Sequence, residues 1–328
     1  RDSAQPMGQQ ANENLMVDLG SVESISFFRF LVYKSKPMKN EYAFGLLTVL
    51  FWSTSATAFK ITLQYLDVLQ LLLYSIITAV VILGAHLLIN KKFHTVFKLK
   101  TKEYVFYLIL GFLNPFVYYW MAIKAYDLLP AQIVQPINYT WVITLSLLSI
   151  PLLKQTFSKM QILATLVCYT GVVVLSYRKG ATTGFEISYF GVFLAISCTI
   201  IWALYWIYNV RSNQDPIVAI FLNFLFSIPF VAIACSVFSS FEVTDLKGIY
   251  GVVWIGCFEF GFAFITWITA LRSAKNTNHV TNLIFLTPFI SLIFIHTILG
   301  EQIQLQTYAG LVLIIIGIVI QKYNELKI

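Results

Sequence analysis

A single acid stands in the middle of a long apolar run of the chain. The run extends from Gly251 to Leu271 and reads GVVWIGCFEFGFAFITWITAL, with Glu259 near its centre. A carboxylate at the centre of a bilayer costs roughly 2.5 to 3.5 kcal/mol, so such residues usually face the interior of a helix bundle or a water-filled cavity. The position makes Glu259 a candidate for binding a proton, another ion or a polar partner in that interior. The structural alternative is an acid that stays protonated and hydrogen-bonded for packing.

Two other apolar segments carry polar side chains on one helical face. Asn114 and Tyr118 lie four residues apart on either side of Pro115, whose missing N–H frees a backbone carbonyl that needs a polar partner or water. Gln135 and Tyr139 have the same spacing in the next segment. Stripes of this kind either join helices through hydrogen bonds or line a path for a solute. A matching stripe, which includes Asn278 and Asn282, recurs later in the chain. We therefore favour the interpretation that these stripes line a path for a solute.

Aromatic and small polar residues extend this set. Trp202 and Tyr205 lie well inside one segment, where they form either the wall of a solute cavity or ordinary core packing. Lys60, near the end of the first segment, either snorkels to the interface or attracts an anionic group. The residues that we predict to line a solute cavity are Trp52, Ser53, Asn114, Tyr118, Gln135, Tyr139, Trp202, Tyr205, Asn278 and Asn282.

The composition is that of an integral membrane protein. Of 328 residues, 58% are hydrophobic and only 11% are charged, with a mean hydropathy of +0.77. The net charge of +7 comes from Lys and Arg in short loops between apolar segments, so it indicates membrane topology rather than a nucleic-acid partner. The chain has no P-loop, GxSxG or HExxH motif, and its cysteines show no metal-ligand spacing. We therefore expect neither an enzyme nor a cofactor or metal site.

Ten apolar segments reach the length of about 20 residues that a bilayer crossing requires. Their short connections are typical of a compact bundle, so we predict an all-α integral membrane fold of ten transmembrane helices. Lys and Arg are concentrated in the loops on the side of both chain ends, which predicts cytoplasmic N- and C-termini. The segments lie near residues 41–61, 68–89, 103–124, 130–150, 158–177, 189–210, 216–238, 248–271, 276–298 and 305–323.

Residues 1–37 are polar and contain no sustained apolar run. The chain starts with Arg1, whereas Met38, Lys39 and Asn40 resemble a natural start. We expect residues 1–37 to be a disordered N-terminal extension, an upstream translation or an expression remnant, and the first membrane helix to act as the insertion signal.

The two halves of the sequence resemble each other. At an offset of 146 residues, Gly171 corresponds to Gly317, and Leu113 corresponds to Glu259. Two five-helix repeats have opposite membrane orientation because five is odd, and inverted repeats are a recurring plan of secondary transporters. Five-helix periodicity also arises by chance in an apolar chain. The predicted repeats occupy residues 38–180 and 187–324.

Four stretches resemble the EamA-type ten-helix members of the drug/metabolite transporter superfamily. They are FWSTSATAFK at 51–60, INYTW at 137–141, IIWALYW at 200–206 and TPFISLIFIHTILGEQIQLQTYAGLVLIIIGIVI at 287–320. The similarity extends from Met38 to the C-terminus, and its most specific part is the closing pattern of Pro288, Gly300-Glu301, Gly310 and Gly317. The resemblance implies two inverted five-helix repeats around a central cavity, with alternating access and no use of ATP.

Within that superfamily, the pattern is most similar to exporters of amino acids, including aromatic ones. The positions that carry this similarity are Trp52, Ser53, Thr54, Asn138, Tyr139 and Trp141. Relatives usually continue with Pro where this chain has Val142, so here the kink of that helix is expected to depend on Pro136 instead.

We therefore expect a secondary transporter of the bacterial inner membrane that exports small organic metabolites such as amino acids. Alternatives are an uncoupled facilitator, an importer, and a membrane-embedded enzyme or flippase for lipid-linked substrates. An enzyme would need polar groups that converge at one interface, whereas Asn114, Gln135 and Glu259 lie well inside their segments. The expected partners are the solute and the lipid bilayer. Small residues on the last segment permit a homodimer but serve internal packing equally well.

Overall fold

Helices form all the regular structure in the part of the chain that the computed structural model describes. The predicted all-α fold is thus confirmed. The predicted extension at 1–37 and two predicted cavity residues, Asn278 and Asn282, lie outside the described residues. The structure describes residues 41–153, 159–176, 187–209, 214–274, 280 and 283–325.

Short π-helical and 3₁₀ segments, labelled η, interrupt or join the α-helices. In chain order the elements are α3 (Glu41–Thr62), α4 (Val68–Ile89), η1 (Phe93–Phe97), α5 (Thr101–Gly111), η2 (Phe112–Val117), α6 (Tyr118–Leu128), α7 (Ala131–Asn138), α8 (Trp141–Leu153), α9 (Lys159–Ser176), α10 (Tyr189–Asn209), α11 (Pro216–Phe238), α12 (Leu246–Trp254), η3 (Ile255–Gly261), α13 (Phe262–Ser273), η4 (Leu283–Leu286), α15 (Thr287–Leu299) and α16 (Leu305–Glu325).

Together these elements make the ten predicted crossings. Seven helical spans are long and apolar enough to cross a membrane, with α5 to α6, α7 to α8 and α12 to α13 each forming one span. Three shorter apolar helices complete the set, at Ile162–Leu175, Leu283–Leu299 and Leu305–Gln321. Helices suit this environment because they satisfy their backbone polar groups without water.

Two of the crossings, each predicted as one apolar segment, contain a π-helical segment. In the first, η2, the backbone leaves helical geometry at Asn114 (φ −147°, ψ 121°), because the ring of Pro115 disfavours the α conformation for the residue before it. The second, η3, contains Glu259 and ends at Gly261. A shift of 146 residues makes η2 overlap η3, so the two irregularities occupy equivalent places in the two repeats.

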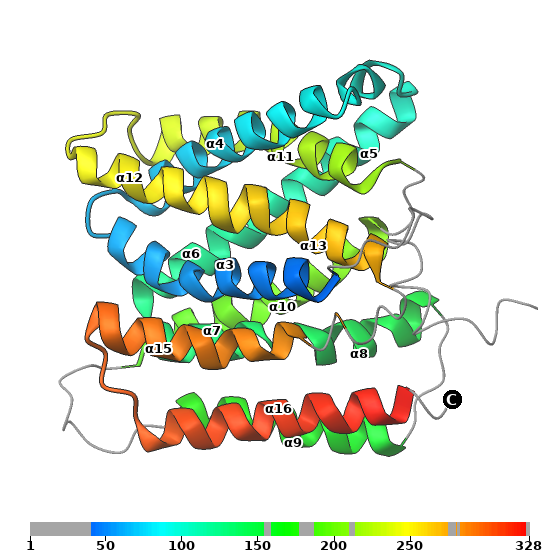
Figure 1. Cartoon of the computed structure of the whole chain (residues 1–328). Coiled ribbons are helices and arrows are strands. Elements are labelled where there is room, and N and C mark those ends of the chain that lie inside the picture. Colours follow the sequence, from blue (N-terminus) through cyan, green and yellow to red (C-terminus); the bar gives the residue numbers. More distant parts are fainter. Residues whose placement is uncertain are drawn as a thin grey trace, which may run out of the picture.

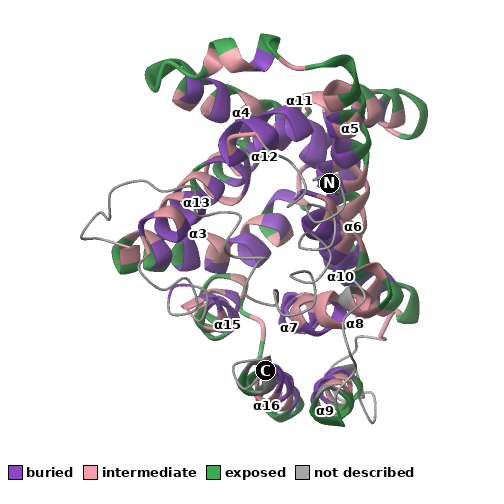
Figure 2. Ribbon diagram, turned by 90° about the vertical axis from the view of Figure 1, so that its right-hand side faces the viewer, coloured by how far each residue is buried: buried purple, intermediate pink, exposed green. Residues whose placement is uncertain are grey.

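The crossings are arranged around a common centre. In the view along the helices, α3 and α13 lie on one side of this centre and α6 and α10 lie on the other (Figure 2). α4 packs against α11 on a third side. α9 and α16 form a separate pair at the edge of the bundle (Figure 1). α3 begins and α16 ends at the same end of the bundle, on the right of Figure 1.

Glycines bring α9 and α16 into close contact. A Cβ atom on Gly310 would lie 2.7 Å from the carbonyl oxygen of Gly171, and one on Gly171 would lie 2.6 Å from the carbonyl oxygen of Gly310. A Cβ atom on Gly317 would lie 2.7 Å from the carbonyl oxygen of Ala164. Small residues permit this approach between membrane helices. The small-residue face of α16 is therefore covered by α9 of the same chain. This face is then not available for the homodimer that the small residues would permit.

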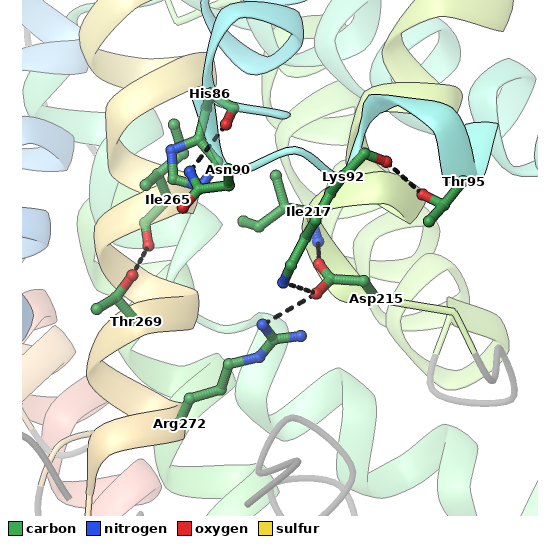
Figure 3. A network of polar contacts seen from close by, with 9 residues as sticks. All are labelled: His86, Asn90, Lys92, Thr95, Asp215, Ile217, Ile265, Thr269 and Arg272. Carbon is green, nitrogen blue, oxygen red and sulfur yellow. Dashed lines mark hydrogen bonds and ion pairs between the residues drawn. The ribbon is translucent and has the colours of Figure 1, made fainter. Parts of the chain in front are cut away.

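Asp215 joins three helices at one end of the bundle. Its side chain accepts a hydrogen bond from the backbone N–H of Ile217 at 2.9 Å and so caps α11. The same carboxylate lies 2.7 Å from Lys92 Nζ, beyond α4, and 3.1 Å from Arg272 Nη1, at the end of α13 (Figure 3). Burial tends to raise the pKa of Asp215, but the hydrogen bond from Lys92 and the charge of Arg272 outweigh it and hold the pKa below its usual value.

Glu301 connects the two repeats at the opposite end. Its carboxylate accepts hydrogen bonds from the backbone N–H groups of Ala131 at 2.9 Å and Gln132 at 3.2 Å. These N–H groups begin α7 and have no partner within that helix. The loop that follows α15 in the second repeat thus caps a helix of the first repeat.

Candidate functional site

A cavity lies among the helices that surround the centre of the bundle. The space free of atoms there is about 850 Å³, a figure that includes open solvent at the mouth of the cavity. Both repeats contribute to its wall. The lining residues are Trp52, Ser55, Phe59, Tyr118, Tyr119, Ala122, Tyr126, Gln135, Asn138, Tyr139, Trp141, Trp202, Trp206, Glu259, Trp267 and Ile284.

Part of the predicted set lines this cavity, and its residues come from four separate stretches of the chain. α3 contributes one of these residues, α6 to α8 contribute three, α10 contributes one, and η3 contributes the acid. The acid therefore faces the interior that both repeats share, as is usual for an acid within a membrane span. The predicted residues at the cavity are Trp52, Tyr118, Gln135, Tyr139, Trp202 and Glu259.

Three predicted residues lie behind the wall instead. Ser53 is fully buried and donates its hydroxyl to the backbone carbonyls of Val49 at 2.6 Å and Thr287 at 3.3 Å. Tyr205 accepts a hydrogen bond at 3.0 Å from the side chain of Asn223 on α11.

Asn114, the third of these residues, is fully buried where α5 gives way to η2. The sequence prediction placed Asn114 on the face of Tyr118 by assuming a regular helix. The break at Asn114 removes that relation, so only Tyr118 reaches the cavity.

The sequence prediction omitted several lining residues, among them Ser55, Phe59, Tyr119, Tyr126 and Trp267. Helical spacing from the predicted residues offered a signal for three of them. Ser55 and Phe59 follow Trp52 by three and seven residues, and Tyr126 follows Tyr118 by eight. Extending each face along its helix would have found these side chains, whereas Trp267 lies beyond η3, where the regular spacing no longer holds. Tyr119 directly follows Tyr118, so it does not share the helical face of that residue.

Two hydroxyl groups of the first repeat hold the carboxylate of Glu259. Ser55 on α3 donates to Oε2, and Tyr119 on α6 donates to Oε1 at 3.1 Å. η3 also lies tightly against α4, because a Cβ atom on Gly256 would come within 2.6 Å of the carbonyl oxygen of Ser75. Each carboxylate oxygen accepts more than one hydrogen bond, so Glu259 keeps capacity for a proton or a solute on the cavity side.

Aromatic rings form most of the remaining wall. On the side of α6 and α10, the ring centroids of Tyr118 and Trp202 lie 4.7 Å apart, and Trp141 lies 6.4 Å from Trp202. Across the centre, Trp52 and Trp267 lie 5.7 Å apart on α3 and α13. Such rings offer flat apolar faces whose quadrupole also attracts cations.

Glu259 is the one formally charged side chain among the described residues of the wall. Lys60 is not part of the wall, because its Nζ donates to the backbone carbonyls of Tyr126 at 2.8 Å and Leu129 at 3.2 Å, at the end of α6. The other polar groups of the wall are hydroxyls, amides and indole N–H groups. The cavity therefore combines aromatic faces with a single acid.

Ten crossings in two inverted repeats around a central cavity are a recurring plan of membrane transporters. The sequence pattern of the EamA-like transporter family matches the chain twice, at residues 39–177 and 189–321, and the chain belongs to this family. The family consists of transporters and is not an enzyme family.

Relatives from bacteria and archaea are named as uncharacterized transporters. The chain is 26% identical over 242 residues to the uncharacterized transporter YvbV of Bacillus subtilis (strain 168), covering 72% of this chain and 78% of the relative. It is 22% identical over 280 residues to an uncharacterized transporter of Archaeoglobus fulgidus, covering 84% and 95%. A solved crystal structure matches with a TM-score of 0.62 at 20% identity, over 88% of this chain and 97% of that one, which shows a shared fold.

Proposed function

We propose that this protein is a secondary-active exporter of small organic metabolites, with amino acids and related compounds as the leading class, and that Glu259 couples export to proton entry. The repeats at 38–180 and 187–324 would move against each other, so that the cavity opens alternately to the two sides. The observation that carries the proposal is the carboxylate of Glu259 at the wall of a cavity that both repeats form.

The hydrogen bonds of Glu259 connect protonation to movement of the repeats. Glu259 belongs to the second repeat, whereas its donors Ser55 and Tyr119 belong to the first. A displacement of one repeat against the other changes the number of donors at the carboxylate, and donors to a carboxylate alter the balance between its charged and neutral forms. Proton binding and the direction in which the cavity opens are thereby linked.

We further propose that the protein resides in the bacterial inner membrane with both termini in the cytoplasm. Support comes from the loop between α4 and α5, at the end of the bundle where the described chain begins and ends. This loop and the start of α5 hold Lys91, Lys92, Lys98, Lys100 and Lys102. An excess of Lys and Arg in short loops marks the cytoplasmic side.

Transport in proteoliposomes tests the coupling. Labelled amino acids and related amines are loaded into vesicles, and efflux is followed with and without an imposed pH gradient for the wild type and for Glu259→Gln. We expect the gradient to accelerate wild-type efflux and to leave the variant unaffected, because an amide at this position cannot exchange a proton.

Glu242→Gln serves as the matched control, because Glu242 is exposed in the loop between α11 and α12. It should behave as the wild type does. A gradient response that persists in Glu259→Gln would place coupling elsewhere. Equal efflux with and without a gradient in the wild type would instead support an uncoupled facilitator.

A further inference from the structure

We infer that the transported solute carries a positively charged amine, which it presents to Glu259 while its apolar or aromatic body lies against the rings of the cavity wall. The inference rests on the proposed transport function for its physiological meaning and names the chemical class of the solute. It follows from charge, ring geometry and the partners of the polar groups.

The balance of charge favours a cation. A charged group that leaves water for an enclosed site needs an opposite charge or a full set of hydrogen bonds. Glu259 supplies the one formal charge of the described wall, and it is negative. A solute carboxylate would meet no described cation there, because Lys60 is occupied by two backbone carbonyls outside the wall.

The rings add a second attraction for the same group. Tyr118, Trp141 and Trp202 form one aromatic cluster, and Trp52 and Trp267 form another across the cavity. A cation over the face of Trp or Tyr within about 6 Å is attracted by the ring quadrupole, and the attraction is stronger when the pair is shielded from water. An ammonium group thus gains from the acid and from the rings, whereas an anion gains from neither.

Several hydroxyl donors of the wall are bound within the protein rather than directed to a solute anion. Gln135 and Tyr126 bind each other through the Tyr126 hydroxyl and the amide oxygen of Gln135. The hydroxyls of Ser55 and Tyr119 donate to Glu259. Three hydroxyl donors of the wall are therefore engaged with the protein itself.

A series of indole compounds with one body and different charges tests the inference. The binding of tryptamine (cationic), tryptophol (neutral) and indole-3-propionate (anionic) is measured by calorimetry on the full chain in lipid nanodiscs. We expect tryptamine to bind at least about 10-fold more tightly than indole-3-propionate, with tryptophol in between. Equal binding, or tighter binding of the anion, would overturn the inference.

Variants assign the preference to the acid. In Glu259→Gln the advantage of tryptamine over tryptophol should disappear, while tryptophol binds within about threefold of its wild-type affinity and so reports an intact cavity. Glu242→Gln should keep the wild-type order. A preference for tryptamine that survives in Glu259→Gln would remove Glu259 from recognition.

The two proposals fail in different ways. Amine binding at Glu259 without any transport in vesicles would contradict the exporter and leave the recognition intact. Proton-coupled transport of a labelled solute by a protein that shows no preference for amines would contradict the amine recognition and leave the coupled transporter intact.

Discussion

Two of the three ion pairs found in the described part of the chain meet at Asp215, between Lys92 and Arg272. Its carboxylate is about one-fifth exposed, so water screens these pairs less than it screens pairs on an open surface. Because the pKa of Asp215 is lowered, the folded protein stabilises the charged form of this carboxyl group more than the unfolded chain does.

Asp215→Asn should lower the free energy of unfolding by about 1 to 2 kcal/mol at pH 7, because two charge-assisted contacts are weakened. A depressed carboxylate pKa stabilises above the unfolded value of about 3.9 and loses this contribution as the pH falls through the folded value. The difference between wild type and variant should therefore shrink below roughly pH 4. Unfolding in detergent at several pH values measures it.

Asp127→Asn is the control for this experiment. Asp127 pairs with Lys124 three residues away, at 2.6 Å, but both side chains are more than one-third exposed. Exposed pairs of this kind contribute at most about 0.5 kcal/mol. If Asp127→Asn lowered the free energy of unfolding as much as Asp215→Asn does, the position of Asp215 at the junction of three helices would not add to stability.

At the residue scale, the rarity of a charge in apolar sequence made Glu259 predictable. An acid in such a run has few low-energy surroundings, and the cavity wall is one of them. Ser53 and Tyr205 show the limit of this reasoning, because their polar groups find partners inside the protein. Periodicity gives the face of a helix but does not say whether a cavity or another helix lies opposite.

At the scale of the element, the packing of α9 against α16 depends on glycines, which have no side chain to separate the two helices. A Cβ atom on Gly310 would lie 2.4 Å from Cγ of Leu175 as well as 2.7 Å from the backbone of Gly171. Neither helix contributes a residue to the cavity wall. Packing of this pair and binding in the cavity should therefore be separable.

Gly310→Leu should destabilise the protein by about 1 to 3 kcal/mol, because the added side chain forces the two backbones apart. Solute binding by the folded fraction should stay at the wild-type level. Ala309→Leu, one position away on the exposed face of α16, is the matched control. Thermal unfolding in detergent compares the two, and equal melting temperatures would show that α9 and α16 do not need their close contact.

At the scale of the element, hydropathy predicted the ten crossings because length and apolar composition are what a bilayer selects. It did not predict the π-helical segments. Pro115 signalled a kink, although not its π-helical form, and no proline marks η3. Instead, the close approach of Gly256 to α4 accompanies η3, and that contact depends on a helix distant in sequence.

For the whole molecule, the membrane orientation can be measured directly. His94 lies in η1, at the lysine-rich end of α4, and Glu242 lies beyond the other end of α4, where its carbonyl oxygen accepts a hydrogen bond from Gln70 at 2.8 Å. Loops at opposite ends of one membrane helix face opposite compartments.

His94→Cys should react with a membrane-impermeant thiol reagent only from the cytoplasmic side, and Glu242→Cys only from the outside. The background lacks the native cysteines, all of which lie within membrane helices. Both sites should react once the membrane is permeabilised, which serves as the control. The reverse pattern would invert the proposed orientation and, with it, the direction of the exporter.

The inverted architecture followed from counting at the scale of the whole molecule, since five crossings per repeat reverse the orientation of the second copy. The cap that Glu301 places on α7 did not follow from counting, because it joins residues that are 170 positions apart in the chain. Contacts between the repeats arise only when both halves are folded together.

The paired π-helical segments bear on the ancestry of the chain. Duplication of a half-protein that contained such an irregularity would leave one at equivalent places in both copies, as η2 and η3 are. The acid is not shared, because Leu113 occupies the place that Glu259 holds in the second copy. On that history the π-helical segment is the inheritance common to both copies, and the carboxylate is a specialisation of the second copy alone.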